Sequence, residues 1–266
     1  MNDMPVQTSA ATQSSSKKVQ LRACRATVIL LVFLGTQIIF GIFTGIAGII
    51  ISVFQGNDLN DTKQFAAMTQ SIVAPAAIIG LVASGLATFL MSKLMIEGHL
   101  KDNSPTGAAW TLGSSRRIAQ GLGVGLFAGL CYLAVSIMFS PQDADLTLGP
   151  VAKMAITPGL SQLLWLMIAI VFAPPIEELL FRGVLFGGYC KSFGTVWAAV
   201  LTTVIFVTLH ITEMYHFLPS IFGITGMAIA ALWLRLKSSA VGPAIAVHWG
   251  YNAILAIVAM HSTLDK

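Results

Sequence analysis

Long apolar runs follow one another along most of this chain, and few of them contain a charged residue. A transmembrane helix needs about 20 apolar residues in succession, whereas a membrane-spanning strand alternates polar and apolar positions. Because the runs do not alternate with a period of two, the pattern predicts helices that cross a membrane. The predicted spans lie at 27–53, 68–92, 118–140, 158–190, 194–212, 217–235 and 239–260. The fourth is long enough to count as two, so we expect an all-α fold, a polytopic transmembrane helix bundle of about seven to eight helices.

The composition indicates that lipid is the main solvent of the chain. Of its 266 residues, 56% are hydrophobic and 10% are charged, whereas about a quarter of the residues of a soluble domain are charged. Lipid offers the backbone no hydrogen bonds, so each span must satisfy its own backbone groups, as a helix does. No basic patch interleaved with aromatic residues occurs, so we expect no nucleic-acid partner. The three cysteines, Cys24, Cys131 and Cys190, share no metal-ligand spacing.

The charges outside the spans predict the orientation. Residues 1–26 are rich in Ser, Thr and Gln and end in basic residues, which is typical of a disordered cytoplasmic tail. The connections at 55–63 and 141–153 are acidic. The other basic clusters fall on the side of the tail, and they contain Lys93, Lys101, Arg116, Arg117, Arg182, Lys191, Arg235 and Lys237. Because Lys and Arg collect on the cytoplasmic side, we expect a cytoplasmic amino terminus. We also expect residues 27–262 to form a single transmembrane helical domain.

The third span carries Gly121, Gly125 and Gly129, spaced four residues apart. Glycines at this spacing form a smooth helix face that another helix can approach closely. We expect this face to pack within the bundle, and a dimer contact is the alternative.

Ionisable side chains are rare within the predicted spans, and such side chains mark function by default. Glu177, Glu178 and Arg182 lie in the fourth span, in the stretch "PPIEELLFRG". Residues four apart share a helix face, so Glu178 and Arg182 are expected to pair and to cancel buried charge. Glu177 is turned about 100° away and has no local partner. A carboxylate in such a poorly solvated place is a competent proton acceptor near neutral pH.

Two further helices supply polar groups at the same spacing of four residues. Phe206 and His210 share a face of the fifth span, and His248 and Asn252 share a face of the last. Glu, His and Asn side chains together provide a base, an electrophilic partner and hydrogen-bond donors, which are what water needs to attack an amide. Their joint occurrence on neighbouring helices favours one shared site.

Each of these residues also has a purely structural explanation. A single intramembrane His can bond a backbone carbonyl, Asn can join two helices, and Phe206 can simply pack. The remaining histidines, His99, His216 and His261, fall in connections or at the chain end, and Glu213 is expected to end the fifth span in water.

In order along the chain, "EELLFR" at 177–182, "FVTLH" at 206–210 and "HWGYN" at 248–252 match the patterns EExxxR, FxxxH and HxxxN. Inside transmembrane helices, this series resembles the three motifs of the CPBP family, also called the Abi family. That family comprises CAAX prenyl endopeptidases and bacteriocin-processing intramembrane proteases. The resemblance covers about residues 155–260, and the first three spans match nothing beyond membrane helices.

The resemblance implies a membrane-embedded endopeptidase. It implies Glu177 as the general base that activates water with help from His210, and His248 and Asn252 as stabilisers of the oxyanion. Glu178, Arg182 and Phe206 would support the site. The implied substrate is a peptide or protein, lipidated or membrane-inserted, and the implied location is the inner (plasma) membrane of a bacterium. Bacteriocin immunity and processing belong to the same range of functions.

The metal dependence stays open at this point. Glu177, His210 and His248 together offer a ligand set for a divalent metal such as zinc, which would activate water near neutral pH. However, the motif HExxH is absent, and no second carboxylate is clearly free to act as the base. The alternative, which we favour, is a glutamate- and histidine-activated water in a dry site, without a cofactor.

Glu177 and His210 can meet only if they lie at a common depth in the membrane. A fourth helix that ended near residue 182 would leave Glu177 close to the surface, far from His210. We therefore expect a long, bent fourth helix that reaches towards residue 190. Pro174 and Pro175 offer the break, since proline removes a backbone donor.

Two other classes of function are compatible with buried ionisable groups. One is a proton-coupled transporter, although the internal repeats and paired broken helices common in transporters are not evident. The other is a non-catalytic membrane scaffold or immunity protein. The sequence does not identify the substrate or the oligomeric state.

Overall fold

The computed structural model describes residues 21–139 and 150–264, and every regular element among them is a helix. The predicted tail up to residue 20 and most of the acidic connection at 141–153 lie outside the described residues. The longer helices are α1 (Ala23–Phe54), α2 (Thr62–Ile96), α3 (Ser115–Phe139), α8 (Thr195–Leu209), α10 (Ser220–Ser238) and α11 (Gly242–Leu264). The predicted all-α polytopic bundle is therefore confirmed.

Six helical stretches of the described part are long and apolar enough to cross a membrane. They are Ala23–Phe54, Thr62–His99, Ser115–Phe139, Leu160–Phe193, Ser220–Ser238 and Gly242–His261. The predicted span at 194–212 is the exception, because α8 has only 15 residues and ends at Leu209. The helical conformation is interrupted at His210, which separates α8 from the short helix α9 (Ile211–His216).

The fourth predicted span is a single helical stretch of 34 residues, which confirms its predicted length. Its segments are α5 (Leu160–Leu166), η2 (Met167–Phe172), α6 (Ala173–Glu178), η3 (Leu179–Leu185) and α7 (Phe186–Phe193). The two η segments are π-helical and flank α6, which holds Pro174, Pro175 and Glu177. π-Helical turns inside α-helices often occur at functional sites, and Glu177 lies between two such segments.

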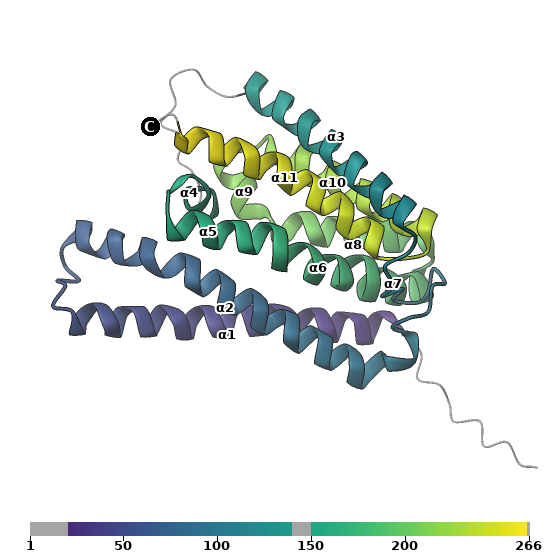
Figure 1. Cartoon of the computed structure of the whole chain (residues 1–266). Helices are drawn as coiled ribbons and strands as arrows, with labels where there is room; N and C mark the ends of the chain where they lie inside the picture. The colour runs from purple at the N-terminus through teal and green to yellow at the C-terminus, as the bar shows by residue number, and fades with distance from the viewer. Residues whose placement is uncertain (1–20, 140–149, 265–266) are drawn as a thin grey trace, which may run out of the picture.

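The helices α1 and α2 form a long hairpin along one side of the molecule (Figure 1). The other helices form a bundle beside it, and the amino-terminal part of α1 packs against α7 and η3. Close contact is possible there because Gly188 has no side chain, and a Cβ at this position would overlap the methyl group of Ala26. Large apolar side chains such as Phe43, Phe54 and Leu94 are exposed on the hairpin, as expected for a surface that faces lipid.

The glycine face of α3 packs against α11, as expected for a contact within the bundle. Gly121, Gly125 and Gly129 are the buried residues of α3. A Cβ at Gly125 would overlap the carbonyl oxygen of Val247, and a Cβ at Gly121 would overlap that of Pro243. The absence of side chains therefore lets α3 lie directly against the backbone of α11, the helix that carries the last motif.

Several helix ends gather at one end of the molecule through hydrogen bonds. The backbone N–H of Ala23 donates to Ser192 Oγ (2.9 Å), and that of Gly242 donates to the carbonyl of Thr111 (3.0 Å). Arg235, one of the basic residues used to predict the orientation, is buried, with 1% of its surface exposed. Its Nη2 donates to the carbonyl oxygens of Gly107 (3.1 Å) and Ser104 (3.3 Å), so it anchors the connection between α2 and α3.

Candidate active site

Glu178 and Arg182 form the ion pair that their spacing predicts. Arg182 Nε lies 3.1 Å from Glu178 Oε2, and both side chains are buried. The other carboxylate oxygen, Glu178 Oε1, lies 3.0 Å from Nδ1 of His248 on α11. An ionised carboxylate only accepts hydrogen bonds, so Nδ1 of His248 carries a hydrogen. Glu178 thus links the first motif directly to the third.

Phe206 lies at the centre of the polar cluster. It is fully buried, and the Arg182 guanidinium lies 4.4 Å from its ring centroid in a cation–π contact. Its ring also meets those of His210 (4.6 Å between centroids) and His248 (6.2 Å). Arg182 in addition donates from Nη2 to the carbonyl of Ala228 on α10 (3.1 Å). The two side chains therefore hold the three motif-bearing helices at fixed distances.

Glu177 is placed differently from Glu178. Oε2 of both residues is buried without a hydrogen bond to any residue in the described part of the chain, but Oε2 of Glu178 faces the Arg182 guanidinium, whereas no ion pair of Glu177 is found among the described residues. A buried carboxylate oxygen without a partner is costly, and in an enzyme it marks a place where water or a substrate group is bound.

His210 ends α8 and bonds its own helix. Its Nδ1 lies 2.9 Å from the carbonyl oxygen of Phe206, four residues earlier. A carbonyl oxygen can only accept, so Nδ1 carries the hydrogen and Nε2 of the neutral ring bears the lone pair. In a continuing α-helix, the Phe206 carbonyl would accept from the backbone N–H of His210. Here the imidazole of His210 takes that place, which accounts for the end of α8 at Leu209.

Asn252 and its neighbour Trp249 both reach η2. Asn252 Nδ2 donates to the carbonyl oxygen of Ala169 (2.8 Å), and Trp249 Nε1 donates to that of Ile170 (2.7 Å). The sequence predicted Asn252 as part of the site but did not single out Trp249. On the other side of Glu177, the indole of Trp110 donates to the carbonyl of Leu179 (3.1 Å).

One cavity of about 860 Å³ is lined by all four of the predicted catalytic residues, Glu177, His210, His248 and Asn252. It extends between the bundle and the hairpin, where Gly41 and Gly80 contribute to its wall. Most of its other lining side chains are apolar, among them Leu81, Leu133, Ile168, Ile224, Met227 and Leu255.

The same cavity is lined by two ionisable residues that the sequence did not assign to it, Glu213 and His216. Both lie on α9, the short helix that the predicted fifth span did not resolve. Thr212 donates to Glu213 Oε2 (2.9 Å), and its carbonyl lies 2.7 Å from His216 Nδ1. Glu213 was expected in water and His216 in a connection, because the end of an apolar run gives no sign that the chain turns back towards the bundle.

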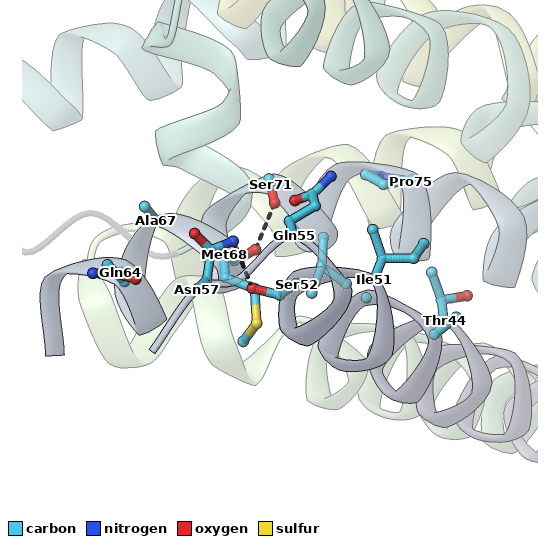
Figure 2. Close-up of a pocket in the computed structure, with 13 residues that line it drawn as sticks. Thr44, Ile51, Ser52, Gln55, Asn57, Gln64, Ala67, Met68, Ser71 and Pro75 are labelled. Carbon is cyan, nitrogen blue, oxygen red and sulfur yellow. Dashed lines mark hydrogen bonds between the residues drawn. The ribbon is translucent and has the colours of Figure 1, made fainter. Parts of the chain in front are cut away.

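A second cavity, of about 560 Å³, lies between α1 and α2 near their connection (Figure 2). Its polar lining residues are hydroxyl and amide side chains, including Ser52, Asn57 and Ser71. None of the residues that line it is ionisable. It therefore offers no acid or base, and the candidate chemistry belongs to the larger cavity.

The described residues contain no group of three or more His, Cys, Asp or Glu side chains arranged to hold a metal ion. In the ligand set considered above, Nδ1 of each histidine already has a partner, Phe206 O for His210 and Glu178 for His248. A divalent metal such as zinc stays the alternative to the water activated by Glu177 and His210 alone.

Comparison with known proteins gives one match. The family described as type II CAAX prenyl endopeptidase Rce1-like matches residues 159–254. No curated protein and no solved structure is significantly similar to the chain. The matched segment contains all three motifs and agrees with the resemblance predicted from them. Residues 159–254 are therefore similar to the Rce1-like family, and this similarity supports a CAAX-type intramembrane protease as the general function.

Proposed function

We propose that the protein is an endopeptidase of the CAAX-processing and bacteriocin-processing type that hydrolyses a peptide bond with a water molecule activated by Glu177 and His210. The observation that carries the proposal is the buried, unpartnered Oε2 of Glu177 in a cavity that His210 also lines. Water bound there can give one hydrogen to the carboxylate and direct the other at the lone pair on His210 Nε2. Both interactions raise the electron density on the water oxygen that attacks the carbonyl carbon.

The oxyanion formed by this attack needs hydrogen-bond donors. The Asn252 amide has two N–H groups, and only one is needed for the bond to Ala169. Nε2 of His248 donates as well when the ring carries a second proton, with the Glu178 carboxylate on Nδ1 stabilising that cation. Donors held in place before the reaction stabilise developing charge most effectively.

In the proposed mechanism, His248 carries a second proton when the oxyanion forms. Glu177 and Glu178 contribute two negative charges, and Arg182 contributes one positive charge. With that proton, these four side chains together carry no net charge. Loss of the charge on Glu177, when it takes a proton from water, is then offset by the negative charge on the oxyanion.

The intermediate collapses as the carbon–oxygen double bond forms again and the carbon–nitrogen bond breaks. The leaving nitrogen takes the proton that Glu177 received from the water, so Glu177 returns to its ionised form. The products are a peptide with a new carboxyl end and a peptide with a new amino end.

The apolar cavity favours a substrate that is lipidated or inserted in the membrane. Its walls include side chains from α1, α2, α3, α10 and α11. We propose that the peptide bond reaches Glu177 while the apolar part of the substrate occupies the space beside the hairpin. In the same proposal, the protein is an integral protein of a bacterial inner membrane with its amino terminus in the cytoplasm.

The first test uses purified full-length protein in detergent and a fluorogenic peptide ending in a CAAX sequence, with and without a farnesyl group on its cysteine. Glu177→Gln keeps the shape of the side chain but removes the base. We expect kcat to fall about 10²–10⁴-fold, with thermal unfolding unchanged. Glu97→Gln, on the exposed turn after α2, serves as the control and should keep full activity.

Glu213→Gln is the competing variant, since Glu213 lines the same cavity. Loss of cleavage in Glu213→Gln but not in Glu177→Gln would transfer the role of base to α9. A proton-coupled transporter would show proton flux that Glu177→Gln alters and no peptide hydrolysis. A scaffold or immunity protein would retain its biological effect with Glu177→Gln.

A further inference from the structure

The two prolines before Glu177 leave backbone carbonyls without helical donors. In an α-helix, the carbonyl of Ile170 accepts from residue 174, and in a π-helix it accepts from residue 175. Both positions are proline, which has no N–H. The carbonyl of Ala169 likewise loses its π-type donor at Pro174. Within a membrane these carbonyls cannot turn to water, so they must bond another part of the protein.

Side chains of α11 supply the missing donors. Trp249 Nε1 donates to Ile170 O at 2.7 Å, and Asn252 Nδ2 donates to Ala169 O at 2.8 Å. The two acceptors are adjacent in η2, and the two donors are three residues apart, so they lie on one side of α11. The pair therefore fixes both the height and the rotation of η2 against α11.

This contact matters because catalytic groups lie on both sides of it. Glu177 follows the prolines by two residues, and His248 directly precedes Trp249. The bond between Glu178 and His248 makes a further connection between the same two helices. A shift of η2 along α11 would therefore change the position of Glu177 relative to the groups that bind the oxyanion.

We propose that Trp249 is a positioning residue, whose indole N–H replaces the donors missing at Pro174 and Pro175 and thereby places Glu177 for attack on the peptide bond. This proposal rests on the proposed function, because it assigns to Glu177 the role of base. Trp249 itself does not touch the reacting atoms. Trp249 is 36% exposed, and its indole N–H is the group that reaches the backbone of η2.

The test starts with Trp249→Phe in the full-length protein, which keeps an aromatic ring but removes the donor. We expect kcat to fall about 10- to 100-fold, because a misplacement of about 1 Å can cost that much, while KM changes less than about twofold. The loss of one hydrogen bond lowers Tm by about 2–4 °C. Trp233→Phe is the matched control, since Trp233 lies on α10, is 48% exposed and makes no side-chain hydrogen bond to any described residue.

A second variant tests the cause of the loss. Pro174→Ala restores a backbone N–H that can donate to Ile170 O without the indole. In the Pro174→Ala background, Trp249→Phe should therefore lower kcat by less than about threefold, and the Tm differences of the two substitutions should not be additive. Additive effects would overturn the proposal. A fall in Tm with unchanged kcat would also overturn it, since Trp249 would then be structural only.

Glu177→Gln in the same assay separates this inference from the proposed function. If the wild-type protein does not cleave the farnesylated or the unmodified peptide, the proposed function and the catalytic effect of Trp249 fail together. The departure from additivity of the Tm changes caused by Trp249→Phe and Pro174→Ala then still decides whether the indole replaces the backbone donors that the prolines lack. If Glu177→Gln abolishes cleavage while Trp249→Phe leaves kcat unchanged, only the positioning inference fails.

Discussion

Each carboxylate oxygen of Glu178 faces a different basic partner, one the guanidinium of Arg182 and the other the imidazole of His248. The side chain is fully buried, so the two contacts take the place of water. Glu177 is its neighbour in sequence but keeps one oxygen unpartnered in the described part of the chain. Two adjacent residues of one type thus lie in different surroundings, because they are separated by a rotation of about 100° around the helix.

The charge on Glu178 makes Arg182 essential for stability. We expect Arg182→Met to lower the free energy of unfolding by about 3–5 kcal/mol, because it leaves a buried carboxylate without its cation. It also removes the bond to Ala228 and the contact with Phe206. Thermal unfolding in a fixed detergent measures the change. The double variant Arg182→Met/Glu178→Gln should recover part of the loss, and an equal or greater loss in the double variant would refute the explanation by charge.

Spacing along one helix predicted these residue-scale features only in part. The contact of Glu178 with Arg182 follows from four residues of separation, and it is found at 3.1 Å. The contact of Glu178 with His248 joins residues 70 apart in sequence, and no periodicity can indicate it. The donor role of Trp249 was equally hidden, because a tryptophan in an apolar helix is typical of any lipid-facing surface.

At the scale of single elements, helix irregularities set the geometry of the site. The 34-residue fourth stretch was predicted to be long, but hydropathy gives no sign of its two π-helical segments. The fifth helix was predicted to reach residue 212, because its apolar run continues past His210. It ends at Leu209, since the imidazole of His210 bonds the Phe206 carbonyl and the chain then turns into α9.

The smooth face of α3 gives a prediction for an element. We expect Gly125→Ala to lower the free energy of unfolding by about 1–3 kcal/mol, because the added methyl group meets the carbonyl oxygen of Val247 and overpacks the contact. It should also lower kcat, since it pushes aside the helix that carries His248. Thermal unfolding and the peptide assay measure both effects.

Gly123→Ala in the same helix is the control. A Cβ at Gly123 would meet nothing within 4 Å, and Ala stabilises a helix by up to about 1 kcal/mol relative to Gly. This variant should therefore be as stable as the wild type or slightly more stable. Equal effects of the two substitutions would show that the contact between α3 and α11 does not depend on the missing side chain.

At the scale of the whole molecule, the polar cluster is enclosed while the apolar exterior is extensive. The hairpin of α1 and α2 lies along one side of the bundle (Figure 1). It contributes residues to the wall of the large cavity and carries many exposed apolar side chains. The all-α bundle could be predicted from the composition and the length of the apolar runs, because only helices and closed barrels satisfy the backbone within lipid. The cavity could not be predicted in this way, since it depends on how the hairpin lies against the bundle.

The distribution of charge then predicts how the molecule lies in its membrane. The helix ends near Lys93, Arg116 and Lys191 belong to the end of the molecule where α1 begins, and the connection of α1 to α2 belongs to the opposite end. Each Lys or Arg near an anionic membrane surface contributes about 1 kcal/mol, so this end should face the cytoplasm. Cys24 is exposed there, and the exposed Leu59 lies in the connection of α1 to α2.

A membrane-impermeant maleimide on intact cells should therefore label Leu59→Cys and leave Cys24 unlabelled until the cells are lysed. Cys24→Ser gives the background from Cys131 and Cys190, and a cytoplasmic thiol protein controls for leakage. Labelling of Cys24 in intact cells, with Leu59→Cys protected, would reverse the orientation. In that case the substrate would approach the cavity from the opposite side of the membrane, although the chemistry proposed for Glu177 would be unchanged.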